Sequence, residues 1–268
     1  MAATAVHLAW ACGRNYAAAL ANPAATELWT LAELAHGAGL QPASRRRAYW
    51  LSRAVARGLL AQVLGAAAPP PTLAPGHGAP PQLEGPAAHG LHLSLAHSAD
   101  SVLVGICRGL PVGVDLEAAA RPLHRPAALM ARLGRAERAV LEALPPVAQH
   151  LALLRLWTLK EASGKALGRG LRLPLTATCC ATGQPENPAN GQRNGTPWAW
   201  WLDDLDGCLL AAVALPQAPW PVRLHLWQAR PSGLLATPGE RWAQGRPGLP
   251  APVACLSQSS RGPQTGGR

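Results

Sequence analysis

The chain has 268 residues, about half of them hydrophobic, which is enough for one large folded domain or two smaller ones. Its formal net charge of +10 favours polyanionic partners, although arginines that only solvate the surface explain the charge equally well. The six cysteines lack metal-ligand spacing, no basic residue precedes the apolar Ala2–Cys12, and no apolar run is long enough to span a bilayer. These features argue against a zinc protein, a secreted protein and a membrane protein, so we expect a soluble, cytoplasmic chain with reduced cysteines.

The first part of the chain predicts one strand and two helices. Val6–Ala11 is typical of a short strand, and Thr26–Ala35 has helical spacing with Thr26 as a candidate cap. In Ser44–Leu64 apolar residues recur every four positions, which predicts a longer helix. Its first turn carries Arg45–Arg47, which oppose the helix dipole. An anion bound nearby would explain them, and a solvated basic helix is the alternative.

A meander of three short strands is predicted after the irregular, Pro- and Gly-rich connection Gly65–Gly90. The strands are Leu91–Leu95, Val102–Cys107 and Val112–Leu116, separated by turns.

Two carboxylates alternate with apolar residues at the end of this meander. The two-residue period puts Val114 and Leu116 on one face of the strand and Asp115 and Glu117 on the other. Two neighbouring carboxylates repel each other unless a cation compensates, and oxygen ligands suit Mg²⁺. A solvent-facing acidic strand end is the simpler alternative.

The second half of the chain predicts a helix within Pro126–Leu144 and another over Val147–Leu167, followed by strands. From Pro231 to the end no periodic apolar pattern remains, so residues 231–268 are interpreted as a flexible tail. The predicted strands are Leu171–Cys180, Trp198–Leu202, Leu209–Leu215 and Val222–Gln228.

The second of these helices contains the only two lysines of the protein, Lys160 and Lys165, against 22 arginines. Trp157, Glu161 and Lys165 lie four residues apart, so a helix aligns them along one face. Lysine is a compact point charge that can release a proton, whereas arginine is a planar fork. The alternative is an ordinary amphipathic helix with a Glu–Lys pair worth about 0.2–0.5 kcal/mol.

Three motifs together resemble a known family. They are Ala96-His97-Ser98, then Val112-Gly113-Val114-Asp115-Leu116-Glu117, then Trp157-Thr158-Leu159-Lys160-Glu161 with Lys165. In order and spacing they are similar to the 4′-phosphopantetheinyl transferase superfamily, specifically its larger surfactin-synthetase-activating type. The resemblance covers roughly residues 45–175, with weaker likeness up to about residue 228.

The resemblance implies an α/β (α+β) fold of two similar subdomains, residues 1–110 and 111–230, packed as an intramolecular pseudo-dimer. It implies Mg²⁺-dependent transfer of 4′-phosphopantetheine from coenzyme A to a serine of an acyl or peptidyl carrier protein, with release of 3′,5′-ADP. Mn²⁺ could replace Mg²⁺. The implied enzyme is a cytoplasmic monomer that acts on neither nucleic acid nor membranes.

Site residues follow from the same resemblance. Asp115, Glu117 and Glu161 would hold the metal ion, and Asp115 would thereby meet the coenzyme A pyrophosphate. Glu161 is also the candidate base, and Lys165 would steady the departing charge. Lys160 lies about 100° round the helix from Glu161, so its expected contact is at the rim of the site, with coenzyme A or with the carrier protein. The nucleotide 3′-phosphate would meet His97 together with Arg45, Arg46 and Arg47.

The sequence departs from the family pattern at three positions. Ala96 replaces the usual serine before the histidine, Ala79 replaces a lysine, and Gly134 replaces a serine at a helix start. We therefore expect weakened coenzyme A binding unless neighbouring arginines compensate. Two other hypotheses remain open: a non-catalytic relative that only binds a carrier protein or a nucleotide, and a basic nucleic-acid-binding protein.

Overall fold

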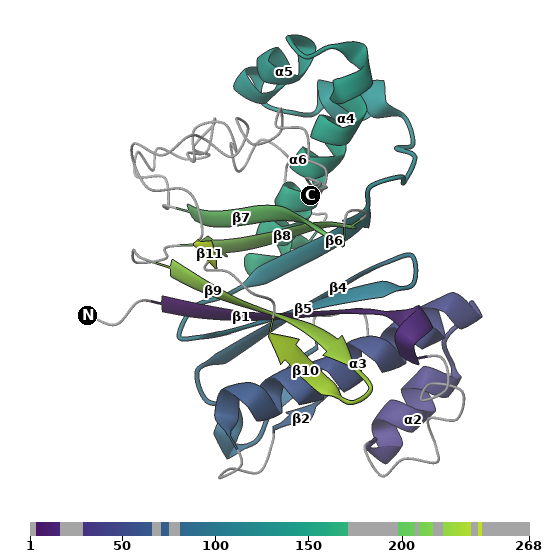
Figure 1. Cartoon of the computed structure of the whole chain (residues 1–268), viewed down its shortest axis with the longest axis vertical. Coiled ribbons are helices and arrows are strands. Elements are labelled where there is room, and N and C mark those ends of the chain that lie inside the picture. The colour runs from purple at the N-terminus through teal and green to yellow at the C-terminus, as the bar shows by residue number, and fades with distance from the viewer. Residues whose placement is uncertain are drawn as a thin grey trace, which may run out of the picture.

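Four layers of secondary structure lie one above the other in the order helix, sheet, sheet, helix (Figure 1). A computed structural model describes residues 4–16, 29–65, 71–74, 81–170, 198–206, 209–216, 222–236 and 241–242. The fold is mixed α+β, as expected. None of the helices in these ranges combines the length and the apolar character that crossing a membrane requires.

The first sheet has the strand order β10-β9-β1-β5-β4, and β11 pairs with β9. Neighbouring strands are antiparallel except β1 and β9, which are parallel. Its strands are β1 (Thr4–Cys12), β4 (Leu91–Ser98), β5 (Ser101–Arg108), β9 (Val222–Arg230), β10 (Gly233–Ala236) and β11 (Arg241–Trp242). A separate two-stranded ribbon pairs β2 (Thr72–Leu73) with β3 (Leu83–Glu84).

The second sheet is antiparallel with the order β6-β8-β7, formed by β6 (Gly113–Ala118), β7 (Trp198–Leu205) and β8 (Leu209–Pro216). The predicted meander is therefore wrong at its last step. β4 and β5 form a hairpin, but β6 leaves that sheet and pairs with β8. The strand pattern in the sequence identified each strand correctly but not the partner of β6.

Helix α3 (Ala43–Leu64) covers the outer face of the first sheet, and α6 (Pro146–Ala166) covers the outer face of the second. α2 (Leu31–Ala38) precedes α3 and begins with a capping box between Thr30 and Glu33. This start differs from the predicted cap at Thr26, which lies outside the described residues. The other elements are two short 3₁₀ turns (Gly13–Tyr16 and Pro86–Ala88), α4 (Pro126–Ala131) and α5 (Arg135–Glu142).

The stretch Pro126–Leu144, predicted to contain a helix, contains two, α4 and α5, and α5 starts where the helix start at Gly134 was expected. The break lies at Leu133-Gly134, where Gly134 is the N-cap of α5 and the Glu137 side chain accepts its N–H at 3.3 Å. The apolar periodicity continues across the break because both helices pack on the same cluster under α6.

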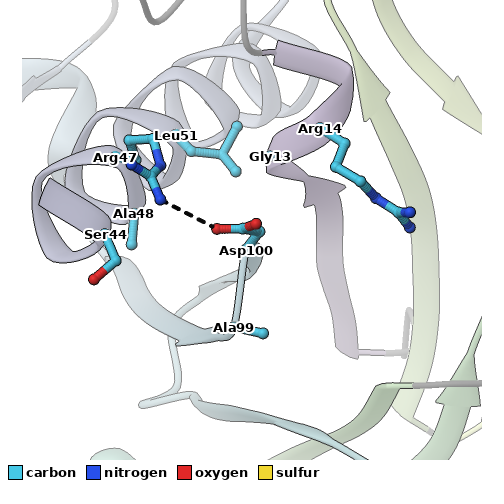
Figure 2. Close-up of a pocket in the computed structure, with 8 residues that line it drawn as sticks. All are labelled: Gly13, Arg14, Ser44, Arg47, Ala48, Leu51, Ala99 and Asp100. Atoms are coloured by element: carbon cyan, nitrogen blue, oxygen red, sulfur yellow. Dashed lines mark ion pairs between the residues drawn. The ribbon is translucent and has the colours of Figure 1, made fainter.

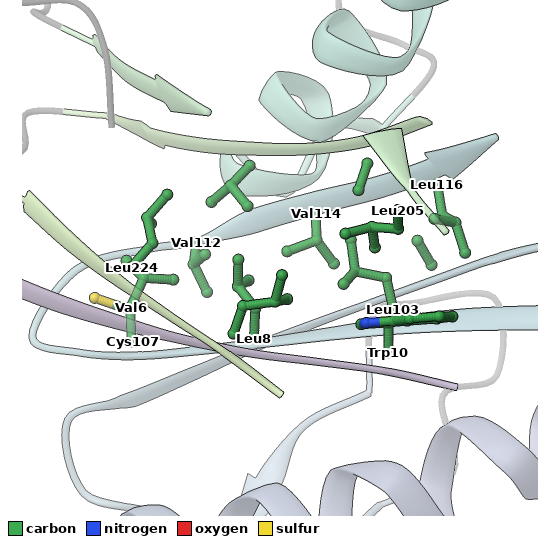
Figure 3. Close-up of a cluster of buried hydrophobic side chains, with 14 of the residues drawn as sticks. Val6, Leu8, Trp10, Leu103, Cys107, Val112, Val114, Leu116, Leu205 and Leu224 are labelled. Carbon is green, nitrogen blue, oxygen red and sulfur yellow. The ribbon is translucent and has the colours of Figure 1, made fainter. Parts of the chain in front are cut away.

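The main core lies between the two sheets, whose inner faces meet side chain to side chain (Figure 3). Alternate residues of each strand point into it, among them Leu8 and Trp10 of β1 and Val114 and Leu116 of β6. At Gly105 on β5 an added Cβ would overlap the side chain of Val114, so a glycine is needed for this close approach.

The two sheets are built from strands and helices that follow the same order, so the fold has two units: the first contains the sheet of β1 and the second the sheet of β6. In the first unit β1 is followed by α3 and the hairpin β4–β5, and β1 pairs with β5. In the second unit β6 is followed by α6 and the hairpin β7–β8, and β6 pairs with β8. Each unit thus has its first strand beside its last, with one long helix on the outer face.

The end of the chain departs from the predicted boundaries. β9, placed by the sequence in the second subdomain, pairs with β1 and belongs to the first sheet. β10 and β11 occupy part of the segment interpreted as a flexible tail. The predicted strand Leu171–Cys180 and residues 243–268 lie outside the described residues.

Candidate active site

One stripe of α6 is partly exposed while the rest of this part of the helix is buried. Between Ala152 and Ala166 every residue is buried except Trp157, Glu161 and Lys165, which are partly exposed. They stand four residues apart, so they share one face as the spacing predicts.

The two carboxylates of strand β6 lie on the face of the strand that meets α6. Because Val114 and Leu116 fill the core between the sheets, Asp115 and Glu117 point to the opposite side, and they are 7% and 6% exposed. Gly113 lets β6 lie directly on α6, since an added Cβ there would overlap the carbonyl oxygen of Ala162. The glycine before Asp115 therefore positions the carboxylates beside the helix.

Asp115 and Lys165 form an ion pair across the two elements. Lys165 Nζ donates to Asp115 Oδ1 at 2.6 Å, and the lysine side chain is 30% exposed. Burial raises the pKa of the Asp115 carboxyl to about 6, although the Lys165 ammonium acts in the opposite direction. The second oxygen, Oδ2, is buried without a hydrogen-bond partner. Asp115 is thus a buried carboxylate with an unsatisfied acceptor.

Glu117 is held at both oxygens. Ser98 on β4 donates its hydroxyl to Glu117 Oε2 at 3.0 Å, and Arg121 forms an ion pair with Oε1. The sequence pattern around Ser98 and Arg121 indicated no role for either residue. Ser98 was visible as the residue after His97, but only the pairing of β4 with β6 in space connects it to the carboxylate.

Glu161 completes the acidic group. Burial and then the charge of Asp115 raise the pKa of Glu161 to about 7, Lys165 opposes the rise, and Glu117 adds to it. The three carboxylates therefore act on one another electrostatically. Within the described part of the chain they do not form a ready-made metal-binding cluster. The chemistry of these carboxylates nevertheless suits a hard divalent cation, because they offer oxygen ligands and one buried oxygen, Asp115 Oδ2, has no hydrogen-bond partner.

His97 and Arg45 line one pocket of about 170 Å³ beside this group. The pKa of His97 lies below its usual value, first because the ring is partly desolvated and then because Lys165 and Arg45 are nearby, while Glu117 acts in the opposite direction. The imidazole is therefore within electrostatic reach of all three charges. The other lining residues are His36, Leu40, Tyr49, Ser52, Arg53, Pro81, Leu95 and Ala96.

A second pocket, of about 460 Å³, continues along β4 from the same place. Pro81 lines both pockets, and Lys165 lines the second one together with Leu91 and Leu93. Lys165 thus lies between the acidic group and a surface hollow, where a ligand could reach its ammonium.

The three consecutive arginines do not all face His97. Arg47 lines a different pocket, of about 190 Å³, at the turn between β4 and β5, and lies 3.8 Å from Asp100 (Figure 2). Arg46 lines neither of these pockets. Of the cluster predicted to accompany His97, Arg45 is the member that shares its pocket.

Lys160 does not lie at a rim, which corrects the prediction for this residue. Its ammonium is 2.8 Å from Glu137 Oε1, and the two side chains are 2% and 0% exposed. The pair joins α6 to α5 inside the second unit. A cofactor contact at Lys160 is therefore not available in this structure.

A comparison with protein families finds one match. Residues 111–215 match the model ACPS, the 4′-phosphopantetheinyl transferase superfamily. The match runs from the start of β6 into β8 and includes Asp115, Glu117, Glu161 and Lys165. This part of the chain is a domain of the 4′-phosphopantetheinyl transferase superfamily. No curated protein matches the chain.

Membership supports a transferase and phosphopantetheine transfer as the general activity of the domain. Proteins of the family act on carrier proteins and generally use coenzyme A and Mg²⁺.

Proposed function

We propose that the protein transfers 4′-phosphopantetheine from coenzyme A to a serine of an acyl or peptidyl carrier protein and releases 3′,5′-ADP. One observation carries this proposal: β6 and α6 bring Asp115, Glu117, Glu161 and Lys165 together, next to the pocket of His97 and Arg45. Acidic residues for a metal ion and cations for phosphate are what phosphoryl transfer requires.

We further propose that the two units are an intramolecular pseudo-dimer with coenzyme A in the cleft between them. The common order of strands and helix in the two units supports this. So does the composition of the second pocket, which takes residues from β4 of the first unit and from α6 of the second. Residues 1–110 would form the first subdomain and residues from 111 the second, with β9 returning to the first sheet.

Asp115, Glu117 and Glu161 would hold Mg²⁺ or Mn²⁺. The unsatisfied Asp115 Oδ2 and the mutual repulsion of the carboxylates favour a cation at this position. A divalent ion would neutralise charge on the pyrophosphate. Lys165, partly exposed at the edge of the second pocket, would bind the pyrophosphate and stabilise the charge of the departing 3′,5′-ADP.

In the transfer, the serine oxygen of the carrier protein forms a bond to the β-phosphorus of coenzyme A. The bond from that phosphorus to the bridging oxygen breaks, and this oxygen leaves with 3′,5′-ADP. The serine proton goes to Glu161, directly or through a water molecule. Glu161 is the candidate base because it lies in the exposed stripe of α6, whereas Asp115 and Glu117 are buried.

The pocket of His97 and Arg45 would take the 3′-phosphate of the nucleotide. Arg53 lines the same pocket, but its guanidinium is buried, pairs with Glu33 and donates to the carbonyl of Ala74. Ala79, where the family has a lysine, lies outside the described residues.

The test is to incubate the purified protein with coenzyme A, Mg²⁺ and an apo carrier protein and to measure the carrier by mass spectrometry. The expected result is the addition of one phosphopantetheine group per carrier. Glu161→Gln should slow the transfer by on the order of 10²-fold or more, since general-base catalysis contributes about 10²–10⁴-fold. Glu142→Gln, at an exposed position on α5, is the matched control and should keep the full rate. Full activity of the Glu161→Gln variant would show that Glu161 is not the base.

A further inference from the structure

Two serines join the edges of the two sheets where β4 meets β6. Ser94 Oγ accepts the N–H of Val114 at 3.0 Å, and Ser98 Oγ accepts the N–H of Ala118 at 3.0 Å. Both serines are buried and stand four residues apart on one face of β4. At these two positions a side-chain hydroxyl replaces the backbone carbonyl that a neighbouring strand would supply.

Ser98 makes one contact that Ser94 does not, because its hydroxyl also donates to Glu117 Oε2 at 3.0 Å. A hydroxyl has one proton and two lone pairs, so the bond accepted from Ala118 leaves the proton free for the carboxylate. A hydrogen bond to an ionised acceptor in a buried place is stronger than one between neutral groups.

The other partner of Glu117 is less well protected from water. The side chain of Arg121 is 44% exposed, so solvent screens its ion pair with Glu117, whereas Ser98 is 9% exposed. Ser98 is therefore the buried partner of this carboxylate. It belongs to the first unit, while Asp115, Glu117 and Glu161 all belong to the second.

We propose that Ser98 is a positioning residue, which holds the Glu117 carboxylate in place for the divalent cation of the transfer reaction. This inference rests on the proposed function. It adds that the first unit supports the metal site of the second through one hydroxyl, in addition to any contribution to coenzyme A binding.

The test compares Ser98→Ala, Ser98→Thr and Ser94→Ala in the full chain. Mn²⁺ binding is measured by electron paramagnetic resonance at a fixed coenzyme A concentration, with a protein-free titration subtracted, and the Mg²⁺ dependence of transfer is measured beside it. Ser98→Ala should weaken Mn²⁺ binding by about 10-fold, the lower end of the effect of losing a residue that orients a metal ligand. Ser98→Thr keeps the hydroxyl and should stay within about threefold of the parent protein.

Ser94→Ala is the matched control, since it loses the same type of bond between the strands but no bond to a carboxylate. Urea unfolding should show a loss of stability in both alanine variants, larger in Ser98→Ala because this variant also loses the bond to Glu117, and only Ser98→Ala should change Mn²⁺ binding. Equal weakening in both variants, or unchanged binding in Ser98→Ala, would overturn the positioning role. If the parent protein transfers phosphopantetheine and binds Mn²⁺, such a result contradicts the positioning role of Ser98 and leaves the proposed function standing. If the parent does neither, the proposed function fails and this inference with it.

Discussion

The two lysines of the protein lie on one helix and have opposite surroundings. Lys160 faces α5 and pairs with Glu137 in a region from which water is excluded, where both side chains are at most 2% exposed. Lys165 faces β6 and pairs with Asp115 at the edge of the second pocket. There the lysine side chain is 30% exposed, and Asp115 Oδ2 has no hydrogen-bond partner.

Five residues of α-helix rotate the side-chain direction by about 140°, which separates the two environments. The difference teaches that closeness of opposite charges does not identify a reacting group. The Lys160–Glu137 pair joins two helices and has no access for a ligand. The Lys165–Asp115 pair has access, an open acceptor and neighbouring carboxylates. The comparison predicts that the same substitution will affect stability at one lysine and activity at the other.

Lys160→Met should produce the larger loss of stability. Removing one partner of a buried ion pair leaves an uncompensated charge and costs about 3–5 kcal/mol in the free energy of unfolding. Urea denaturation measures this loss, while the rate of transfer per folded molecule should stay within about twofold of the parent.

The double variant Lys160→Met with Glu137→Gln provides the control. Glutamine keeps an acceptor for Gly134 N–H and removes the buried charge, so most of the lost stability should return. If the double variant is as unstable as Lys160→Met, the Glu137 charge is not the cause.

Lys165→Met should have the reverse effect. Loss of a cation that stabilises charge in the transition state lowers kcat by about 10²–10³-fold, or about 2.7–4 kcal/mol. Stability should fall by less than in Lys160→Met, because Lys165 is partly exposed and the Asp115 carboxyl, with its pKa raised to about 6, can take up a proton. Steady-state transfer kinetics and urea unfolding of the same preparation separate the two effects. A stable variant with full kcat would contradict the assignment of Lys165.

The local pattern of the sequence was sufficient for the strand β6 and for the face of α6 that meets it. Alternation put Asp115 and Glu117 opposite Val114 and Leu116, and the four-residue spacing put Glu161 and Lys165 together, as observed. These predictions succeed because each depends only on the period of one element.

Contacts between distant segments could not be predicted in this way. Nothing near β6 indicates that its partner is β8, about 100 residues later, and nothing near β9 indicates that it returns to β1. The same limit explains the errors at Lys160, whose partner is on another helix, and the missing role of Ser98. Burial and pairing are properties of the assembled layers.

The smallest effects are expected for Arg45 and Arg47, two residues of α3 that lie in different surroundings. Arg45 lines the pocket of His97, whereas Arg47 lies near Asp100 in a different pocket, and both side chains of that second pair are more than half exposed. Arg45→Ala should raise KM for coenzyme A by about 3- to 10-fold, the value of a hydrogen bond to a charged group in part-exposed surroundings. Arg47→Ala should change KM by less than about twofold, because exposed ion pairs contribute little.

Competition with 3′-dephospho-coenzyme A locates the contact that Arg45 makes. If Arg45 contacts the 3′-phosphate, the parent protein should bind coenzyme A more tightly than 3′-dephospho-coenzyme A. Arg45→Ala should lose part of that preference, because only the binding of coenzyme A should weaken. If the binding of both compounds weakens equally, Arg45 contacts another part of the nucleotide. Equal effects of Arg45→Ala and Arg47→Ala would mean that general positive charge, and not the pocket beside His97, attracts the substrate.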